Sequence, residues 1–173
     1  MNWFTADEHY NHANILNKFI FRPFKNTEEM NMEIISRHNS RVKNGDTVYH
    51  LGDFKFSSYG PNVYELIQQL NGRHVFIRGN HDKNNGLNSC LQYAVIQLYS
   101  HDVLLIHKPE DATEIMFKNG IKMAFCGHVH EKWKMMKKDD MIFINVGVDQ
   151  WDFYPIDSKQ IFKAIKKAGF SPA

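Results

Sequence analysis

The sequence has little of what marks secreted, membrane-spanning or disulfide-stabilised proteins. It contains 2 cysteines, Cys90 and Cys126, which form neither a disulfide framework nor a C-x-x-C metal motif. No apolar run approaches the roughly 18 to 20 residues of a membrane span, and no basic leader precedes an apolar run at the start. We therefore expect a cytoplasmic protein with two reduced thiols and no membrane partner.

The net charge is also small. The 173 residues carry a formal charge of +2, whereas a nucleic-acid-binding face normally shows as a strong excess of Lys and Arg. Hydrophobic residues make up 43% and charged residues 23%, which is typical of a packed globular chain. The length suits one domain over residues 1–173. Several of the 10 histidines stand beside Asp or Gly, and because histidine is the commonest metal ligand, their placement is the main clue to function.

Strand-like and helix-like apolar patterns alternate along the chain. Alternation of this kind predicts an α/β domain whose largely parallel strands are covered on both faces. Helices are expected over 27–42, 61–70, 112–118 and 158–167, and strands over 2–6, 47–51, 74–78, 94–98, 103–106, 122–126 and 141–146. The segments 83–89 and 131–140 are expected to be irregular, and the lysines of 131–140 are typical of a solvated loop.

Polar clusters follow five of the predicted strands. Ligands of open α/β sheets bind at the carboxyl ends of the strands, so a mostly parallel sheet brings such clusters to one edge. Any one cluster has a simple alternative interpretation as a polar loop, but all of them in order at strand ends favour a binding site. The clusters are Asp7-Glu8-His9, Gly52-Asp53, Gly79-Asn80-His81-Asp82, His107 and Gly127-His128-Val129-His130.

The ligand types in these clusters suit two divalent cations. Carboxylate, amide oxygen and imidazole without thiolate favour Mn, Fe, Zn or similar ions over a cysteine-rich structural zinc. Two ions about 3.5 to 4 Å apart need a ligand between them, and a carboxylate is the natural bridge. Asp53 is the best candidate because it follows the second predicted strand. Gly52, Gly79 and Gly127 each precede a candidate ligand, where a sharp turn or a close approach of backbone favours glycine.

Taken together, these motifs resemble those of the calcineurin-like metallophosphoesterases, whose signature runs D-x-H, G-D, G-N-H-[DE], H, G-H-x-H. The resemblance implies a four-layer α/β/β/α sandwich with two mixed sheets and helices outside. It implies that Asp7, His9, Asp53 and His130 hold one metal ion, and that Asp53, Asn80, His107 and His128 hold the other. His107 departs slightly from the pattern, since no glycine flanks it in Leu104-Leu105-Ile106-His107-Lys108-Pro109.

The resemblance also implies a catalytic arrangement. A water or hydroxide between the ions would attack the phosphorus, because two cations lower the pKa of that water and bind the phosphate oxygens. His81 would protonate the leaving oxygen or bind the phosphate, and Asp82 would accept a hydrogen bond from the His81 ring and fix its tautomer.

Four further residues were given roles from the sequence. Arg22 is the expected phosphate contact outside the metal ligands, because a guanidinium matches phosphate geometry. His12 lies three positions after His9 and is expected either near the metals or as a helix cap. His50 is expected to be a buried, hydrogen-bonded core residue. Trp151 is expected either in the core or beside the cleft.

Three functions remain open at this point. The first is a metal-dependent phosphodiesterase or phosphatase acting on a small phosphoester, with a nucleotide as one example and Mn, Fe, Zn, Co or Ni as the cation. The second is a nuclease of the same chemistry, which predicts a basic groove that the small net charge does not favour. The third is a non-catalytic interaction module, and a retromer subunit of this fold shows that site residues can be lost. Here every motif residue is present, His81 included.

Overall fold

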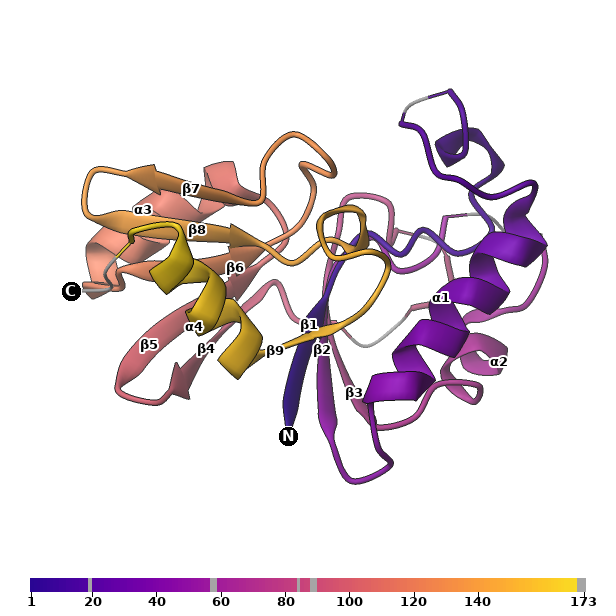
Figure 1. The fold of residues 1–173 in the computed structure, drawn as a ribbon, viewed down its shortest axis with the longest axis horizontal. Coiled ribbons are helices and arrows are strands. Elements are labelled where there is room, and N and C mark those ends of the chain that lie inside the picture. The colour runs from indigo at the N-terminus through magenta and orange to yellow at the C-terminus, as the bar shows by residue number, and fades with distance from the viewer. Residues whose placement is uncertain (19, 57–58, 84, 88–89, 171–173) are drawn as a thin grey trace.

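Two mixed β-sheets form the centre of the computed structural model, which describes residues 1–18, 20–56, 59–83, 85–87 and 90–170 (Figure 1). The first sheet contains β1 (Asn2–Thr5), β2 (Thr47–Leu51), β3 (Arg73–Ile77) and β9 (Ile156–Asp157) in the order β3-β2-β1-β9. β1, β2 and β3 run parallel, with Phe4 opposite Tyr49, and β9 runs antiparallel to β1.

The second sheet has the order β4-β5-β6-β8-β7. It contains β4 (Tyr93–Leu98), β5 (His101–Ile106), β6 (Met123–Cys126), β7 (Met135–Lys138) and β8 (Met141–Asn145). β5, β6 and β8 are parallel, and the hairpin partners β4 and β7 run antiparallel at the two edges.

Helices cover the outer faces of both sheets, as the resemblance implied. α1 (Thr27–Arg41) and α2 (Val63–Ile67) lie on the side of the first sheet, and α3 (Pro109–Asn119) lies on the second. Met30 and Ile34 of α1 pack with Leu66 of α2 in one apolar cluster, whereas Met116 of α3 packs with Leu104 of the second sheet in another. The two short 3-10 helices are η1 (Ala13–Ile15) and η2 (Val148–Gln150).

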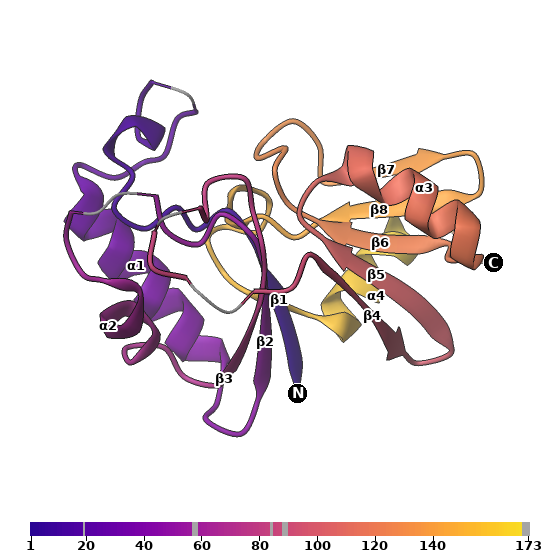
Figure 2. The same ribbon diagram turned by 180° about the vertical axis from the view of Figure 1, so that it is seen from behind.

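The last helix, α4, spans the residues that were predicted for it, Ser158–Lys167. Figures 1 and 2 show α3 and α4 on opposite faces of the second sheet. Ile161 and Ile165 of α4 join the cluster between the sheets, because its apolar positions fall on one side of the helix. Asp157 and Gln160 form a capping box at its start, which satisfies backbone donors of the first turn.

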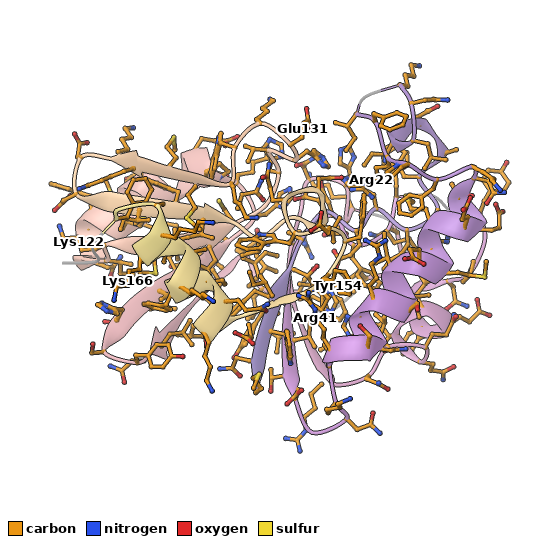
Figure 3. All side chains as sticks on the ribbon, viewed as in Figure 1. Arg22, Arg41, Lys122, Glu131, Tyr154 and Lys166 are labelled. Carbon is orange, nitrogen blue, oxygen red and sulfur yellow. The ribbon has the colours of Figure 1, made fainter. Side chains whose placement is uncertain are left out.

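Aromatic contacts hold the two sheets together. Phe4 of β1 meets Phe125 of β6 edge-on with ring centroids 4.9 Å apart, and it stacks on Tyr49 at 5.4 Å. Both phenylalanines are fully buried. At the far side of the first sheet, Arg41 of α1 lies 4.0 Å over the ring of Tyr154, which ties the helix to the segment before β9 (Figure 3).

Some predicted elements needed correction. The solvated loop predicted over 131–140 contains β7, an edge strand whose Lys137 and Lys138 are exposed. The helix predicted over 61–70 is shorter, at Val63–Ile67, and β9 was not predicted. The irregular segment predicted over 83–89 lies partly outside the described residues. Among the helices that are described, none combines the length and the apolar character that crossing a bilayer requires.

We expect Phe125→Ala to lower the free energy of unfolding by about 3–5 kcal/mol, because it removes a fully buried ring between the sheets. Urea denaturation of the two proteins measures this difference. The matched control is Phe117→Ala on α3, whose side chain is 83% exposed and which should change stability by less than about 0.5 kcal/mol. Equal effects of the two substitutions would contradict the assignment of Phe125 to the inter-sheet core.

Candidate metal centre

The strand ends of both sheets meet at one end of the sandwich. Asp7, Asp53 and Asn80 follow β1, β2 and β3 of the first sheet, and His107 and His128 follow β5 and β6 of the second. The strands are parallel within each set, so their carboxyl ends point the same way. The clusters therefore converge as predicted, but they come from two facing sheets rather than from one sheet edge.

The backbone of most candidate ligands adopts an unusual conformation. Five of them have positive φ, between 47° and 72°. Non-glycine residues rarely occupy this left-handed region, although Asp and His tolerate it better than most. Each such residue turns the chain sharply out of its strand or loop. The five are Asp7, His9, Asp53, His128 and His130.

The glycines next to the ligands serve mainly as points of close approach. Gly52 does have the positive φ that the sequence suggested, at +95°. A Cβ on Gly79 would lie 2.1 Å from an Asp53 carboxylate oxygen, and one on Gly127 would lie 2.6 Å from an Asp7 oxygen. A side chain at either position would displace a candidate ligand, so the sharp turns fall on the ligands while the glycines provide room for them.

Two groups of possible metal ligands lie side by side. Within each group the ligand atoms are within 4.8 Å of one another, and the groups are Asp7, His9 and His130, and Asp53, His107 and His128. Asp53 also relates the two groups, because its Oδ2 lies 3.3 Å from His107 Nε2 and 3.6 Å from His9 Nε2. Asn80 joins the second group through its Oδ1, 3.0 Å from His107 Nε2. The structure thus brings together the side chains that the resemblance assigned to the metal ions.

Hydrogen bonds orient the imidazoles. His107 Nδ1 lies 2.7 Å from the Leu51 carbonyl oxygen, to which it can only donate, so Nε2 faces the centre. His130 Nδ1 lies 2.9 Å from the Asp149 carboxylate, which has the same effect on that ring. His9 Nδ1 and His12 Nδ1 are 3.2 Å apart, so His12 contacts a candidate ligand, as one of its two predicted roles required. Orienting partners of this kind commonly accompany metal-binding histidines.

Burial and mutual charge determine the protonation of the centre. Burial raises the pKa of Asp7 to about 6 and lowers the pKa of His9 well below its usual value. Burial alone would lower the pKa of His107, but the hydrogen bond to Asp53 and the charges of Asp7 and Asp53 raise it to about 9. The same partnership holds the pKa of Asp53 well below its usual range, although burial opposes this.

These residues fit divalent cations. Asp7 and Asp53 are buried carboxylates without a Lys or Arg in ion-pair contact among the described residues. His9 Nε2 is buried and has no hydrogen-bond partner in the described part of the chain. Buried charges and buried polar atoms are costly unless they are paired or coordinate a metal. The mixed oxygen and nitrogen set without thiolate matches Mn, Fe, Zn and related ions.

His81 and Asp82 differ in how they match their predicted roles. The His81 ring lines the same cavity as His9 and His130, while its backbone N–H donates to Asp53 Oδ1 at 2.8 Å. The Asp82 carboxylate instead accepts hydrogen bonds from the backbone N–H groups of Asp53, Phe54 and Gly79. Asp82 therefore connects two ligand-bearing loops, and the predicted bond to the His81 ring is replaced by these contacts.

Arg22 is the clearest correction. Its side chain is buried, and its guanidinium donates to both carboxylate oxygens of Asp149 at 2.9 Å. The same guanidinium donates to the backbone oxygens of Asp7 at 2.7 Å and Glu8 at 2.9 Å. Figure 3 shows Arg22 among the loops where the two halves of the molecule meet. These contacts occupy its donors, so Arg22 supports the centre and does not serve as the predicted phosphate contact.

Sequence reasoning missed two supporting residues. Asp149 links Arg22 to His130, and its signal was its position in Gly147-Val148-Asp149 just after β8, the same pattern as at the other strand ends. Glu8 lies between Asp7 and His9 in the sequence, but its carboxylate contacts His50 Nδ1 at 2.6 Å. The buried, hydrogen-bonded role predicted for His50 is confirmed, since its Nε2 also contacts His74 Nδ1 at 2.9 Å. No pattern in the sequence indicates this pairing.

Comparison with known proteins agrees with the geometry. A family model described as the calcineurin-like phosphoesterase superfamily domain matches residues 6–154. An uncharacterized protein of Methanocaldococcus jannaschii is 36% identical, over 95% of this chain and 91% of its own. The crystal structure of a protein of unknown function from Aquifex aeolicus is 29% identical with a TM-score of 0.77, covering 95% of this chain and 99% of that one.

The structure of a novel archaeal phosphodiesterase shares the fold at a TM-score of 0.55 and 20% identity, covering 92% of this chain and 94% of that chain. Likeness at this level of identity concerns the fold alone. The family model spans most of the sequence, from just before Asp7 to beyond Asp149, and thus includes every residue of the two ligand groups. The chain belongs to the calcineurin-like phosphoesterase superfamily.

Proposed function

We propose that this protein is a metal-dependent phosphoesterase that hydrolyses a small phosphoester, such as a nucleotide, with two divalent cations at the centre. The observation that carries the proposal is the pair of adjacent ligand groups, with an Asp53 oxygen within 3.6 Å of a histidine nitrogen from each. We assign Asp7, His9, Asp53 and His130 to one ion and Asp53, Asn80, His107 and His128 to the other. Manganese is the proposed ion, and Fe, Zn, Co and Ni are accepted by the same ligands.

The chain's own residues have distinct tasks in this proposal. Bound cations would supply an activated water and neutralise charge on the phosphate oxygens. His81 holds a proton for the leaving oxygen, since its ring faces the cavity beside His9 and His130. Asp149, held by Arg22, keeps His130 in the tautomer that leaves Nε2 available. Asp82 keeps the loops of Asp53 and His81 at a fixed separation through its backbone hydrogen bonds.

We expect His81→Ala to lower kcat by about 10²- to 10⁴-fold for phenyl esters, the range typical of losing a general acid. The loss should be smaller for 4-nitrophenyl esters, because nitrophenolate is a weaker base and needs less protonation as it leaves. The measurement is Mn²⁺-dependent hydrolysis of both diesters by wild type, H81A and the control H101A, a histidine at the start of β5. An equal loss of kcat for both esters would instead indicate that His81 binds the phosphate. Asp53→Asn should abolish turnover of both esters, because Asp53 is assigned to both ions.

We expect metal binding to tighten as the pH rises from about 6 to about 9 in this protein, because protons on Asp7 and His107 compete with the cation. The pKa of Asp7 is raised to about 6 and that of His107 to about 9, so both groups release protons across this window. Calorimetry in buffers of different ionisation enthalpy should show roughly one proton released near neutral pH.

His101→Asn is the control for this pH dependence. His101 is the first residue of β5, the strand that ends just before His107, and it lies outside both ligand groups. Its pH slope should equal that of the wild type. Metal affinity that stays constant across the window, with no proton release, would contradict the protonation assigned to His107.

A nuclease remains the second candidate because one observation favours it. A cavity of about 380 Å³ borders Asn80 and His107, and Arg78, Lys83 and Lys108 line it together with a single carboxylate, Asp111. Such a concentration of positively charged side chains beside the centre was not evident from the net charge of +2. Lys and Arg side chains placed in this way bind phosphates of a nucleic-acid backbone.

If the substrate is a nucleic acid, Arg78→Glu and Lys83→Glu should each raise KM for a single-stranded oligonucleotide at least about tenfold more than for bis(4-nitrophenyl) phosphate. The control is Lys166→Glu on α4, a matched charge change away from the centre (Figure 3). Cleavage assays at two salt concentrations measure the effect. Equal changes for both substrates would leave the small phosphoester as the substrate class.

A further inference from the structure

An apolar cavity opens beside the first ligand group. It has a volume of about 220 Å³, and imidazoles of the centre share its lining with apolar side chains. A water-filled approach to two cations would not require apolar walls, because apolar surface is stabilised only when it is removed from water. The polar lining residues include His9, His81 and His130. The apolar lining residues are Ile15, Ile20 and Phe56.

Phe56 contributes the one phenyl ring among the described lining residues of this cavity, and this ring contacts two histidine rings. It stacks on His12 with ring centroids 3.6 Å apart and an interplanar angle of 11°. It meets the His81 ring edge-on at 5.0 Å. Even so, 40% of the Phe56 side chain is exposed. A large apolar ring is therefore held open to the cavity within contact distance of the proposed proton donor.

A larger cavity of about 600 Å³ shares His12 and Phe56 with the first one. Met32 and Tyr59 contribute to its lining and are 66% and 82% exposed. Its size falls within the range of about 300 to 1,000 Å³ that is usual for small-molecule sites. The space around Phe56 is thus large enough for an organic group well beyond a methyl.

The position of His81 decides which part of an ester enters this space. A proton donor must lie within hydrogen-bond reach of the leaving oxygen, so the carbon skeleton attached to that oxygen extends into the cavity that His81 lines. The P–O bond to the leaving group breaks, water provides the new P–O bond, and the His81 proton ends on the leaving oxygen. The cationic cavity of Arg78 and Lys108 does not include His81 in its lining, so by the same criterion it would not take the leaving group.

We propose that the cavity beside Phe56 binds the leaving group of the substrate and selects a planar, apolar one. This assignment rests on the proposed phosphoesterase function. It specifies the substrate class as phosphoesters of aromatic or similarly flat ring-bearing alcohols, with the ring stacked or edge-on against Phe56. A planar ring in this position gains both apolar burial and an aromatic contact.

Phenylphosphonate and methylphosphonate test the proposal, because both present the same phosphonate to the cations and neither can be hydrolysed. With Mn²⁺ present, calorimetry on the wild type should show phenylphosphonate binding about tenfold tighter, equivalent to ~1.4 kcal/mol. Phe56→Ala should bring the ratio of the two Kd values close to one, and Phe56→Trp should keep or increase it. Phe117→Ala, an exposed phenylalanine on α3, is the matched control and should keep the wild-type ratio.

The outcomes distinguish the leaving-group proposal from the phosphoesterase function on which it rests. A wild type that hydrolyses esters but binds both phosphonates equally overturns the leaving-group assignment and leaves the phosphoesterase function standing. A preference for phenylphosphonate that survives in F56A also overturns it, because the ring then binds elsewhere. A wild type that hydrolyses no ester removes the proposed function, whereas a Phe56-dependent preference would still locate the aromatic site.

Discussion

The centre depends on five residues that leave regular backbone geometry at the same end of the molecule. Asp7, His9, Asp53, His128 and His130 all have positive φ, a conformation that costs roughly 1–3 kcal/mol for a residue other than glycine. Such residues persist only where surrounding contacts determine them. The contacts are present here: the N–H of Asp7 donates to Gly52, that of His9 to the Asp53 carbonyl, and that of His128 to the Asp7 carboxylate. The segments that carry the candidate ligands thus fix one another's backbone through hydrogen bonds.

Buried charge imposes the second constraint, and long-range hydrogen bonds meet it. Asp82 uses its carboxylate to fix the backbone of Asp53 and Gly79, and Arg22 uses its guanidinium to fix Asp149 and the carbonyl of Asp7. A buried ion pair such as Arg22–Asp149 contributes little net stability compared with apolar packing, although removing one partner is costly. Its contribution here is orientation, because the same Asp149 carboxylate determines which nitrogen of His130 faces the centre.

Features that depend on local sequence patterns could be predicted, whereas features that depend on contacts between residues far apart in the sequence could not. Elements with one buried face were predicted well: α4 was expected over 158–167 and occupies Ser158–Lys167, and β2 occupies the expected 47–51. β7 was missed because an edge strand bearing lysines shows little apolar alternation. The candidate ligands could be brought to one place from the sequence because each lies within four residues of the end of a strand. The role of Arg22 could not be predicted, since its partner Asp149 is 127 positions away and only the tertiary fold brings them together.

The packing between the sheets is part of the functional site. Each ligand group takes its carboxylate from the first sheet and an imidazole from the second: Asp7 with His130, and Asp53 with His107 and His128. A shift of one sheet against the other would separate the carboxylate from the imidazole in both groups at once. Because close-packed interiors resist such shifts, the buried Phe4–Phe125 contact and the ligand geometry are linked. The fold therefore sets the separation of the ligands before any cation binds.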